Sequence, residues 1–319
     1  MRPVQVRSLV EAGVMSAVAI IFALISVYVP LLGSLVNLIW PVPIILLGVR
    51  HGYKWSIMAT AVSGMMIAIL IEPVLAVKTV VGFSLIGIVL GHAIREKYSP
   101  VKTLLCGSVA ALISNLAVLG LVMLILGINP LNMDFQMMEK TMEEVMNIYR
   151  SQGISEEDIA RAGELMRNVF VLMQVLIPAM FALGAVMTTY INFACARLVL
   201  RRLGQPTPGF PPFKHWKMPE SVLWAFIAGT AMTYLGSTQQ MDLVYRIGEN
   251  VRWFGLIFTL VQGLAVFYFL ADKYNLSRMV RGIILLLTFT VPILAYVAIY
   301  AGAFDIALDY RKLRKPRES

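Results

Sequence analysis

Long runs of apolar residues alternate with short polar gaps along most of the chain. A helix that crosses a bilayer needs about 20 mainly apolar residues, and runs near this length recur. They predict nine helices, at residues 9–29, 35–49, 55–71, 77–94, 103–126, 169–200, 221–235, 254–271 and 282–300. The pattern therefore predicts an all-α integral membrane protein.

Basic residues in the polar gaps agree with the positive-inside rule. If the N-terminus lies in the cytoplasm, the gaps after the second, fourth, sixth and eighth helices face the cytoplasm. These gaps contain Arg50 and Lys54; Arg95, Lys97 and Lys102; Arg201, Arg202, Lys214 and Lys217; and Lys273, Arg278 and Arg281. The other gaps have less net positive charge, which predicts a multi-pass cell-membrane protein with a cytoplasmic N-terminus.

The first apolar run resembles a signal peptide because Arg2 and Arg7 precede it. However, Glu11 interrupts its start, the run continues to Pro30, and no small-residue cleavage pattern follows. We therefore expect an uncleaved first helix.

The C-terminal tail does not fit nine complete spans. It contains the basic residues Arg311, Lys312, Arg314, Lys315 and Arg317. A ninth full span would place them outside the cell, against the positive-inside rule. Either Pro292 breaks the ninth segment into a kinked or re-entrant one, or an earlier span is miscounted.

Three parts of the chain differ in composition. Residues 1–203 predict a six-helix membrane core, residues 204–219 a stiff proline-rich cytoplasmic connector, and residues 220–319 about three further helices and the basic tail. The core contains a polar extracytoplasmic insert at residues 129–167. We expect two short amphipathic helices there, joined near Gly153, which either cap a binding site or form a packed surface pair.

Composition supports the membrane class, since 59% of the residues are hydrophobic and only 14% are charged. Soluble domains are roughly 45–50% apolar and about 25% charged. The net charge of +9 lies in the gaps rather than in a basic stripe interleaved with aromatic residues. Membrane lipid is therefore a predicted partner and nucleic acid is not.

Residues for catalysis or cofactor binding are sparse. His51, His92 and His215 lie near predicted helix ends, and none has a second histidine at metal-ligand spacing. Cys106 and Cys195 lie inside apolar runs, which favours packing. No metalloprotease, nucleophile-elbow or P-loop motif is present. We expect no enzyme, cofactor or metal site, and any ATP-driven work would require a partner.

Polar residues within spans are costly and often functional. Those predicted to lie on the outer side, and therefore to contact a solute, are Asn37, Trp40, Glu72, Lys78 and Gln174. The alternative for Glu72 and Lys78 is a local ion pair. The alternative for Asn115 and Gln262, deeper in their helices, is a hydrogen bond between helices.

Small residues recur at four-residue spacing on the first helix, at Ala12, Ser16, Ala19 and Ala23. Such a strip lets another helix approach closely. It predicts either a docking face for a partner or internal packing. Near the C-terminus, Asp305 and Asp309 either brace an interfacial helix or are solvated charges at its end.

Two stretches resemble known families. Residues 41–52 (PVPIILLGVRHG), Trp55 and the Ser63-Gly64 pair follow the small-residue strip. This order resembles the substrate-binding S components of energy-coupling-factor (ECF) vitamin transporters, over residues 9–200. Residues 302–312 (GAFDIALDYRK) resemble the ending of the YybS-type family of bacterial membrane proteins, a likeness that could extend over the whole chain.

The S-component resemblance implies a protein that binds a small solute from outside and works with an ECF-type coupling subunit and its ATPases. It also implies that the strip on the first helix meets that subunit. S components usually have six helices, so the extra helices and the long 129–167 insert are departures. The alternative function is a non-transporting membrane scaffold or regulator of the cell envelope.

Overall fold

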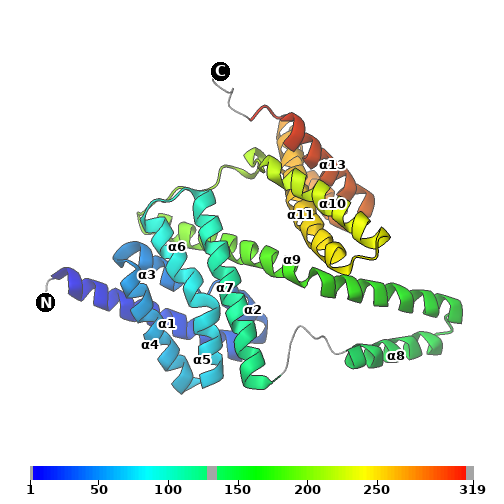
Figure 1. Cartoon of the computed structure of the whole chain (residues 1–319). Helices are drawn as coiled ribbons and strands as arrows, with labels where there is room; N and C mark the ends of the chain where they lie inside the picture. The colour runs from blue at the N-terminus through cyan, green and yellow to red at the C-terminus, as the bar shows by residue number, and fades with distance from the viewer. Residues whose placement is uncertain (1–2, 128–134, 314–319) are drawn as a thin grey trace. The chain divides into compact units, whose positions relative to one another are not determined.

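The computed structural model describes the backbone of residues 3–127 and 135–313 and the side chains of residues 6–125, 127 and 141–313. Within these ranges the chain forms helices and connections, without a strand (Figure 1). Contacts divide it into two compact units, residues 1–132 with 181–209 and residues 133–180 with 210–319. The prediction of an all-α membrane protein is confirmed.

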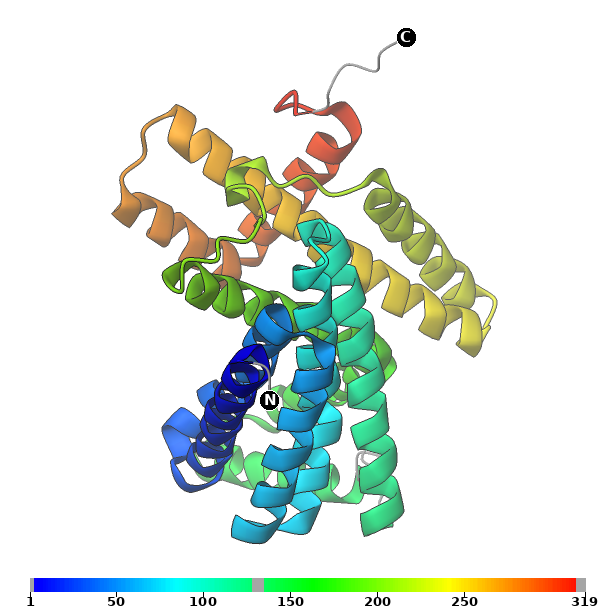
Figure 2. The same cartoon turned by 90° about the vertical axis from the view of Figure 1, so that its left-hand side faces the viewer.

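The first unit is built around one buried helix. Its elements are α1 (Pro3–Tyr28), α2 (Pro30–Leu38), α3 (Val42–His51), α4 (Tyr53–Leu70), α5 (Pro73–Thr79), a π-helical turn (Val80–Ser84), α6 (Leu85–Arg95), α7 (Pro100–Leu126) and the end of α9 (Glu156–Arg202). Helix α3 contacts α1, α4 and α6, and its residues 42–48 are all buried. Figure 2 shows the blue and cyan helices of this unit side by side.

The second predicted helix is broken rather than continuous. Its two parts, α2 and α3, are joined by a turn at residues 39–41. Pro41 disfavours helical backbone at the preceding residue, Trp40. The Trp40 indole nitrogen donates to the Ala19 carbonyl oxygen of α1 at 2.9 Å, which holds the turn in place.

The second unit contains the C-terminal helices. Its elements are α8 (Phe135–Ser151), residues 156–180 of α9, a 3-10 turn (Phe213–His215), α10 (Glu220–Thr238), α11 (Asp242–Lys273), α12 (Arg278–Thr290) and α13 (Pro292–Leu308). Helices α10 and α11 pack closely because glycines lie between them. A side chain at Gly229 or Gly248 would overlap the backbone of the other helix.

Seven helices or helix pairs among the described residues are long and apolar enough to cross a membrane, and a bent pair raises the number to eight. They include all the predicted helices except the seventh and the ninth. The seventh forms as α10 but is not among these candidates. The eighth begins at Asp242, twelve residues earlier than predicted. Its added N-terminal part contains charged residues, among them the buried Glu249, which pairs with the half-buried Arg252.

The ninth predicted helix is broken before Pro292. Helices α12 and α13 meet at a bend of 103°, and Val291 between them is extended, as expected for a residue before proline. Near the start of α12, Arg281 forms an ion pair with Asp272 at the end of α11. Asp272 also forms an ion pair with Lys214 of the connector. Since Arg311 donates to the Trp216 carbonyl at 2.6 Å, the chain returns after α13 to the connector.

The predicted insert forms only one separate helix, α8. The second amphipathic segment is continuous with the sixth span, so that both belong to α9. Ser155 caps the N-terminus of α9, since the Asp158 backbone nitrogen donates to Ser155 Oγ at 3.2 Å. Gly153 lies in the connection with φ of +79°, a conformation that glycine adopts readily.

Helix α9 contains Pro178, which removes one backbone donor and crowds the preceding turn. Asn250 of α11 compensates for this disturbance. Its Oδ1 accepts from the Ala179 backbone nitrogen at 2.8 Å, and its Nδ2 donates to the Val175 carbonyl oxygen at 2.7 Å. These two backbone groups are four residues apart, so one carboxamide takes the place of a helical hydrogen bond.

Candidate binding site

Trp40, a predicted solute contact, is a core residue of the first unit. It is fully buried, its indole nitrogen is bonded to Ala19, and its ring lies 6.1 Å from that of Phe83. It belongs to a cluster of buried apolar residues that also contains Ile44 and Ile67. Trp40 therefore stabilises the packing of α1 against α3.

The other four predicted solute contacts are at least partly accessible. Asn37 and Gln174 are half-buried, and Glu72 and Lys78 are exposed. The described side chains of Glu72 and Lys78 form no ion pair with each other. Gln174 belongs to the second unit, whereas Asn37, Glu72 and Lys78 belong to the first. Their grouping into one solute site stays a prediction.

The small-residue strip of α1 is buried inside the first unit. Ala12, Ser16, Ala19 and Ala23 are all covered. Ser16 Oγ donates to the Ala59 carbonyl oxygen of α4 at 3.3 Å. The structure thus corrects the prediction of a docking face: the strip brings α1 close to α3 and α4 of the same chain, which is the internal-packing alternative.

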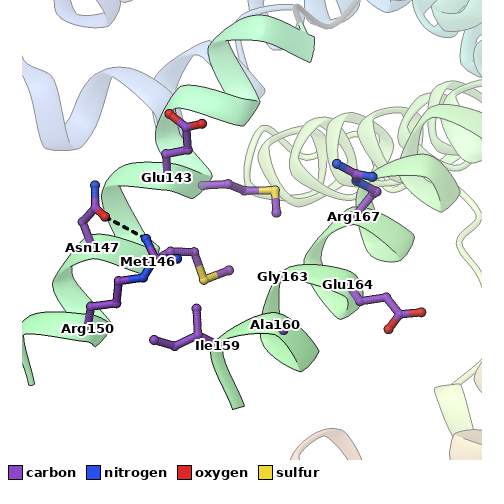
Figure 3. A pocket seen from close by; sticks show the side chains of 10 residues that line it. Glu143, Met146, Asn147, Arg150, Ile159, Ala160, Gly163, Glu164 and Arg167 are labelled. Atoms are coloured by element: carbon purple, nitrogen blue, oxygen red, sulfur yellow. Dashed lines mark hydrogen bonds between the residues drawn. The ribbon is translucent and has the colours of Figure 1, made fainter. Parts of the chain in front are cut away.

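A cavity of about 690 Å³ lies between α8 and the start of α9. Its lining residues are Met142, Glu143, Met146, Asn147, Arg150, Ile159, Ala160, Gly163, Glu164 and Arg167. Figure 3 shows that they come from two adjacent helices. A pocket of this volume falls within the range of small-molecule sites in proteins.

The floor of this cavity is apolar and its polar groups carry both charges. Met146 and Ile159 are buried between the helices, and a side chain at Gly163 would lie 3.1 Å from Met146 Cε. Arg150 Nε donates to Glu156 Oε1 and its Nη1 donates to Asn147 Oδ1, both at 3.0 Å. Arg167, Glu143 and Glu164 complete the polar lining, so side chains of both charges line the cavity.

A polar cluster that sequence reasoning missed joins α1 to α3. Ser8 Oγ lies 2.8 Å from His51 Nδ1, and His51 Nε2 lies 2.7 Å from Glu11 Oε2. The other Glu11 oxygen lies 3.1 Å from Arg50 Nη2 and 3.2 Å from Arg7 Nε. These contacts join Ser8 and Glu11 of α1 to the C-terminal end of α3. The four-residue spacing of Arg7 and Glu11 was the available signal.

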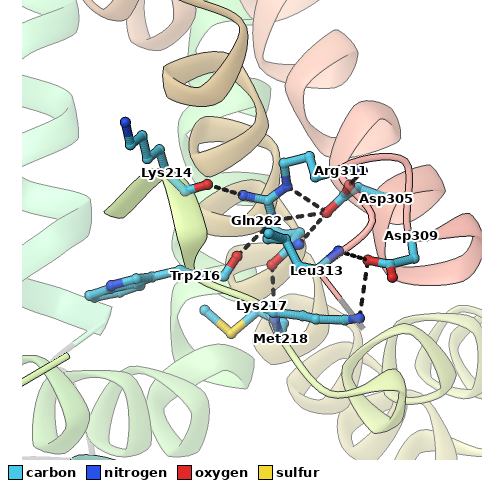
Figure 4. A network of polar contacts seen from close by, with 9 residues as sticks. All are labelled: Lys214, Trp216, Lys217, Met218, Gln262, Asp305, Asp309, Arg311 and Leu313. Carbon is cyan, nitrogen blue, oxygen red and sulfur yellow. Dashed lines mark hydrogen bonds and ion pairs between the residues drawn. The ribbon is translucent and has the colours of Figure 1, made fainter. Parts of the chain in front are cut away.

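A second network, in the second unit, surrounds the end of α13 (Figure 4). Arg311 Nη2 and Asp305 Oδ2 are 2.9 Å apart, and both side chains are almost completely buried. Gln262 Nε2 of α11 donates to the same Asp305 oxygen at 2.5 Å. Gln262 therefore makes a hydrogen bond between helices, which was one of its predicted roles. Asp305 pairs with Arg311, which was predicted to belong to the basic C-terminal tail.

Lys217 of the connector pairs with Asp309 at 3.1 Å, beside this network. The described residues contain no group of three His, Cys, Asp or Glu side chains placed to hold a metal ion. The described polar clusters thus hold helices together, and the α8–α9 cavity is the candidate binding site.

These features define an all-helical membrane protein with several apolar helices. The chain belongs to the family described as Predicted membrane protein (DUF2232), whose model matches residues 17–306. It is 23% identical over 307 residues to "Uncharacterized protein YybS" of Bacillus subtilis (strain 168), covering 96% of this chain and 98% of that protein. The YybS-type resemblance is therefore confirmed. No solved structure matches the chain.

Proposed function

We propose that this protein is a membrane-embedded component that binds a small polar solute, in the manner of ECF-transporter S components, and that it is not itself an enzyme. The observation that carries the proposal is the cavity of about 690 Å³ between α8 and α9. It falls in the segment that the loop charges predict to be extracytoplasmic. An ATP-driven coupling subunit would supply the energy for uptake.

The lining of the cavity suggests how a solute is held. The guanidinium group of Arg167 suits a carboxylate or phosphate, whereas Arg150, which also lines the cavity, already donates to Glu156 and Asn147. Glu143 and Glu164 accept hydrogen bonds from amines or hydroxyls. Met142 and Met146 offer a flexible apolar surface. A small solute with an anionic group and an apolar part fits this combination.

The experiment is mass spectrometry of small molecules retained by the full-length protein in mild detergent. Glu143→Gln and Arg167→Gln should reduce retention of the solute. Glu144→Gln and Arg161→Gln are matched controls because these residues lie on the same helices and do not line the cavity. If all four variants retain the solute as the unchanged protein does, the cavity is not its site.

Burial of the α1 strip favours a second candidate function. Since Ala19 and Ala23 already pack inside the chain, this strip is not available to a coupling subunit. A non-transporting scaffold or regulator of the cell envelope requires no such contact. Co-purification of a coupling subunit and its ATPases would support the transport proposal, and capture of envelope proteins without any uptake phenotype would support the scaffold.

A further inference from the structure

A second cavity, of about 570 Å³, lies against the end of α13. One side is apolar and consists of Val266 of α11 with Ala301, Phe304 and Leu308, which share one face of α13. The other side consists of Asp305, Asp309, Tyr310 and Lys312. The cavity is therefore amphipathic, with the apolar part along the helix and the polar part at its end.

The two carboxylates that line this cavity are already neutralised. Asp305 is paired with the buried Arg311 and accepts a hydrogen bond from Gln262. Asp309 is paired with Lys217, and its Oδ1 also accepts from the Leu313 backbone nitrogen at 3.1 Å. Figure 4 shows both acidic groups directed toward these partners. A cationic ligand would find no carboxylate here without a basic partner.

Lys312 provides the remaining charge. Its side chain is exposed, and among the described residues it forms no ion pair. Tyr310 beside it is also exposed, and tyrosine is enriched where the membrane surface meets water. The polar part of the cavity consequently carries one uncompensated positive charge and one phenol hydroxyl.

The apolar part is open to the surroundings of the helix, because Phe304 and Leu308 are both exposed. In a membrane protein, a large exposed apolar face contacts lipid chains. A ligand that suits this cavity has a long apolar portion ending in a negative group. Basic residues next to a span attract the anionic lipids of the cytoplasmic leaflet, and the loop charges predict that side for the connector that contacts Arg311.

We propose that this cavity binds an anionic phospholipid. One acyl chain lies along Val266, Ala301, Phe304 and Leu308, and the phosphate pairs with the Lys312 ammonium near the Tyr310 hydroxyl. Arg311 and Lys217 take part indirectly, because they cancel the carboxylates that would otherwise repel the phosphate. The site is independent of the solute cavity between α8 and α9.

The test measures lipid retained by the full-length protein after reconstitution with equimolar phosphatidylglycerol and phosphatidylcholine, using native mass spectrometry. Unchanged protein should retain phosphatidylglycerol preferentially. Lys312→Gln should lower that preference about fivefold, which corresponds to about 1 kcal/mol for one basic residue at the surface. Lys273→Gln is the matched control, because Lys273 is exposed in the same unit and does not line the cavity.

A second variant tests the apolar part. Ala301→Trp should fill the acyl-chain path and lower retention of both lipids, with helical content unchanged by circular dichroism. Equal retention of the two lipids by unchanged protein would overturn the proposal. So would an equal effect of Lys273→Gln and Lys312→Gln, or displacement of the lipid by soluble glycerol phosphate, which would assign the site to a free phosphate.

Discussion

Arg311 allows a direct test of how burial changes the contribution of an ion pair. Its side chain is fully buried and lies 2.9 Å from Asp305, which is 3% exposed. The same unit contains a second Arg–Asp pair, Arg246 with Asp242, at 2.8 Å, whose side chains are 56% and 74% exposed. The two pairs have the same chemistry and nearly the same distance, but only the Arg311 pair is buried. Arg311 also donates to two backbone carbonyls, of Lys214 and Trp216.

Arg311→Met leaves the Asp305 carboxylate buried without its cation and leaves the Lys214 and Trp216 carbonyls without their donor. Loss of one member of a buried pair costs about 3–5 kcal/mol. At about 2–4 °C per kcal/mol for a unit of this size, the melting midpoint should fall by roughly 6–20 °C. Arg246→Met should cost about 0–1 kcal/mol, because its pair is exposed to solvent.

The assay is thermal unfolding of the full-length protein in mild detergent, followed by circular dichroism and tryptophan fluorescence. The double variant Asp305→Leu with Arg311→Met should recover most of the lost stability, because no charge is then left buried. Equal shifts for Arg311→Met and Arg246→Met would refute the reasoning. A double variant as unstable as Arg311→Met would show that the carbonyl contacts matter more than the uncompensated charge.

Three further predictions concern helix packing and topology. Asn250→Leu should destabilise the protein by about 1–3 kcal/mol in the same melting assay, since it leaves buried backbone groups of α9 without a partner. In a Pro178→Ala background the effect should be smaller, because α9 can then form its regular backbone hydrogen bonds. Gly263→Ala should prevent normal folding, because the added Cβ would overlap the Ala298 carbonyl of α13. Gly184→Ala is the control: its Cβ would have no neighbour within 4 Å, so thermal melting and yield should show a neutral or slightly stabilising effect. If the α12–α13 pair is re-entrant, reporter fusions in the connector 204–219 and at the C-terminus should report the same side of the membrane; opposite sides would contradict that course and favour a broken span.

Much of the fold could be predicted from hydrophobic runs because a bilayer imposes a minimum length on each span. Seven of the nine predicted helices are among the candidate spans, and Pro292 indicated the break that separates α12 from α13. Prolines and apolar runs act locally, so they can be read along the chain. The break between α2 and α3 was not predicted, although Pro41 was visible, because a proline near a helix start is also compatible with a continuous helix.

The candidate sites were harder to predict because they depend on which residues meet in space. The four-residue spacing of Ala12, Ser16, Ala19 and Ala23 indicated a face for close packing, but spacing does not say whether the neighbour is α4 of the same chain or another protein. Trp40 was predicted to contact a solute for the same reason. The sequence placed it on the outer side of the second predicted helix, but it did not show the hydrogen bond from its indole nitrogen to the Ala19 carbonyl oxygen.

The sequence by itself determined the class of protein, the approximate spans and the family, because apolar length, loop charge and short motifs are properties of contiguous residues. Only the tertiary structure decided that Arg311 is buried against Asp305 rather than solvated in a basic tail. It also decided that the Asn250 side chain bonds to two backbone groups of α9 beside Pro178. These pairings join residues from different elements, and a buried charge or backbone group is stable only where folding brings its partner within hydrogen-bonding distance.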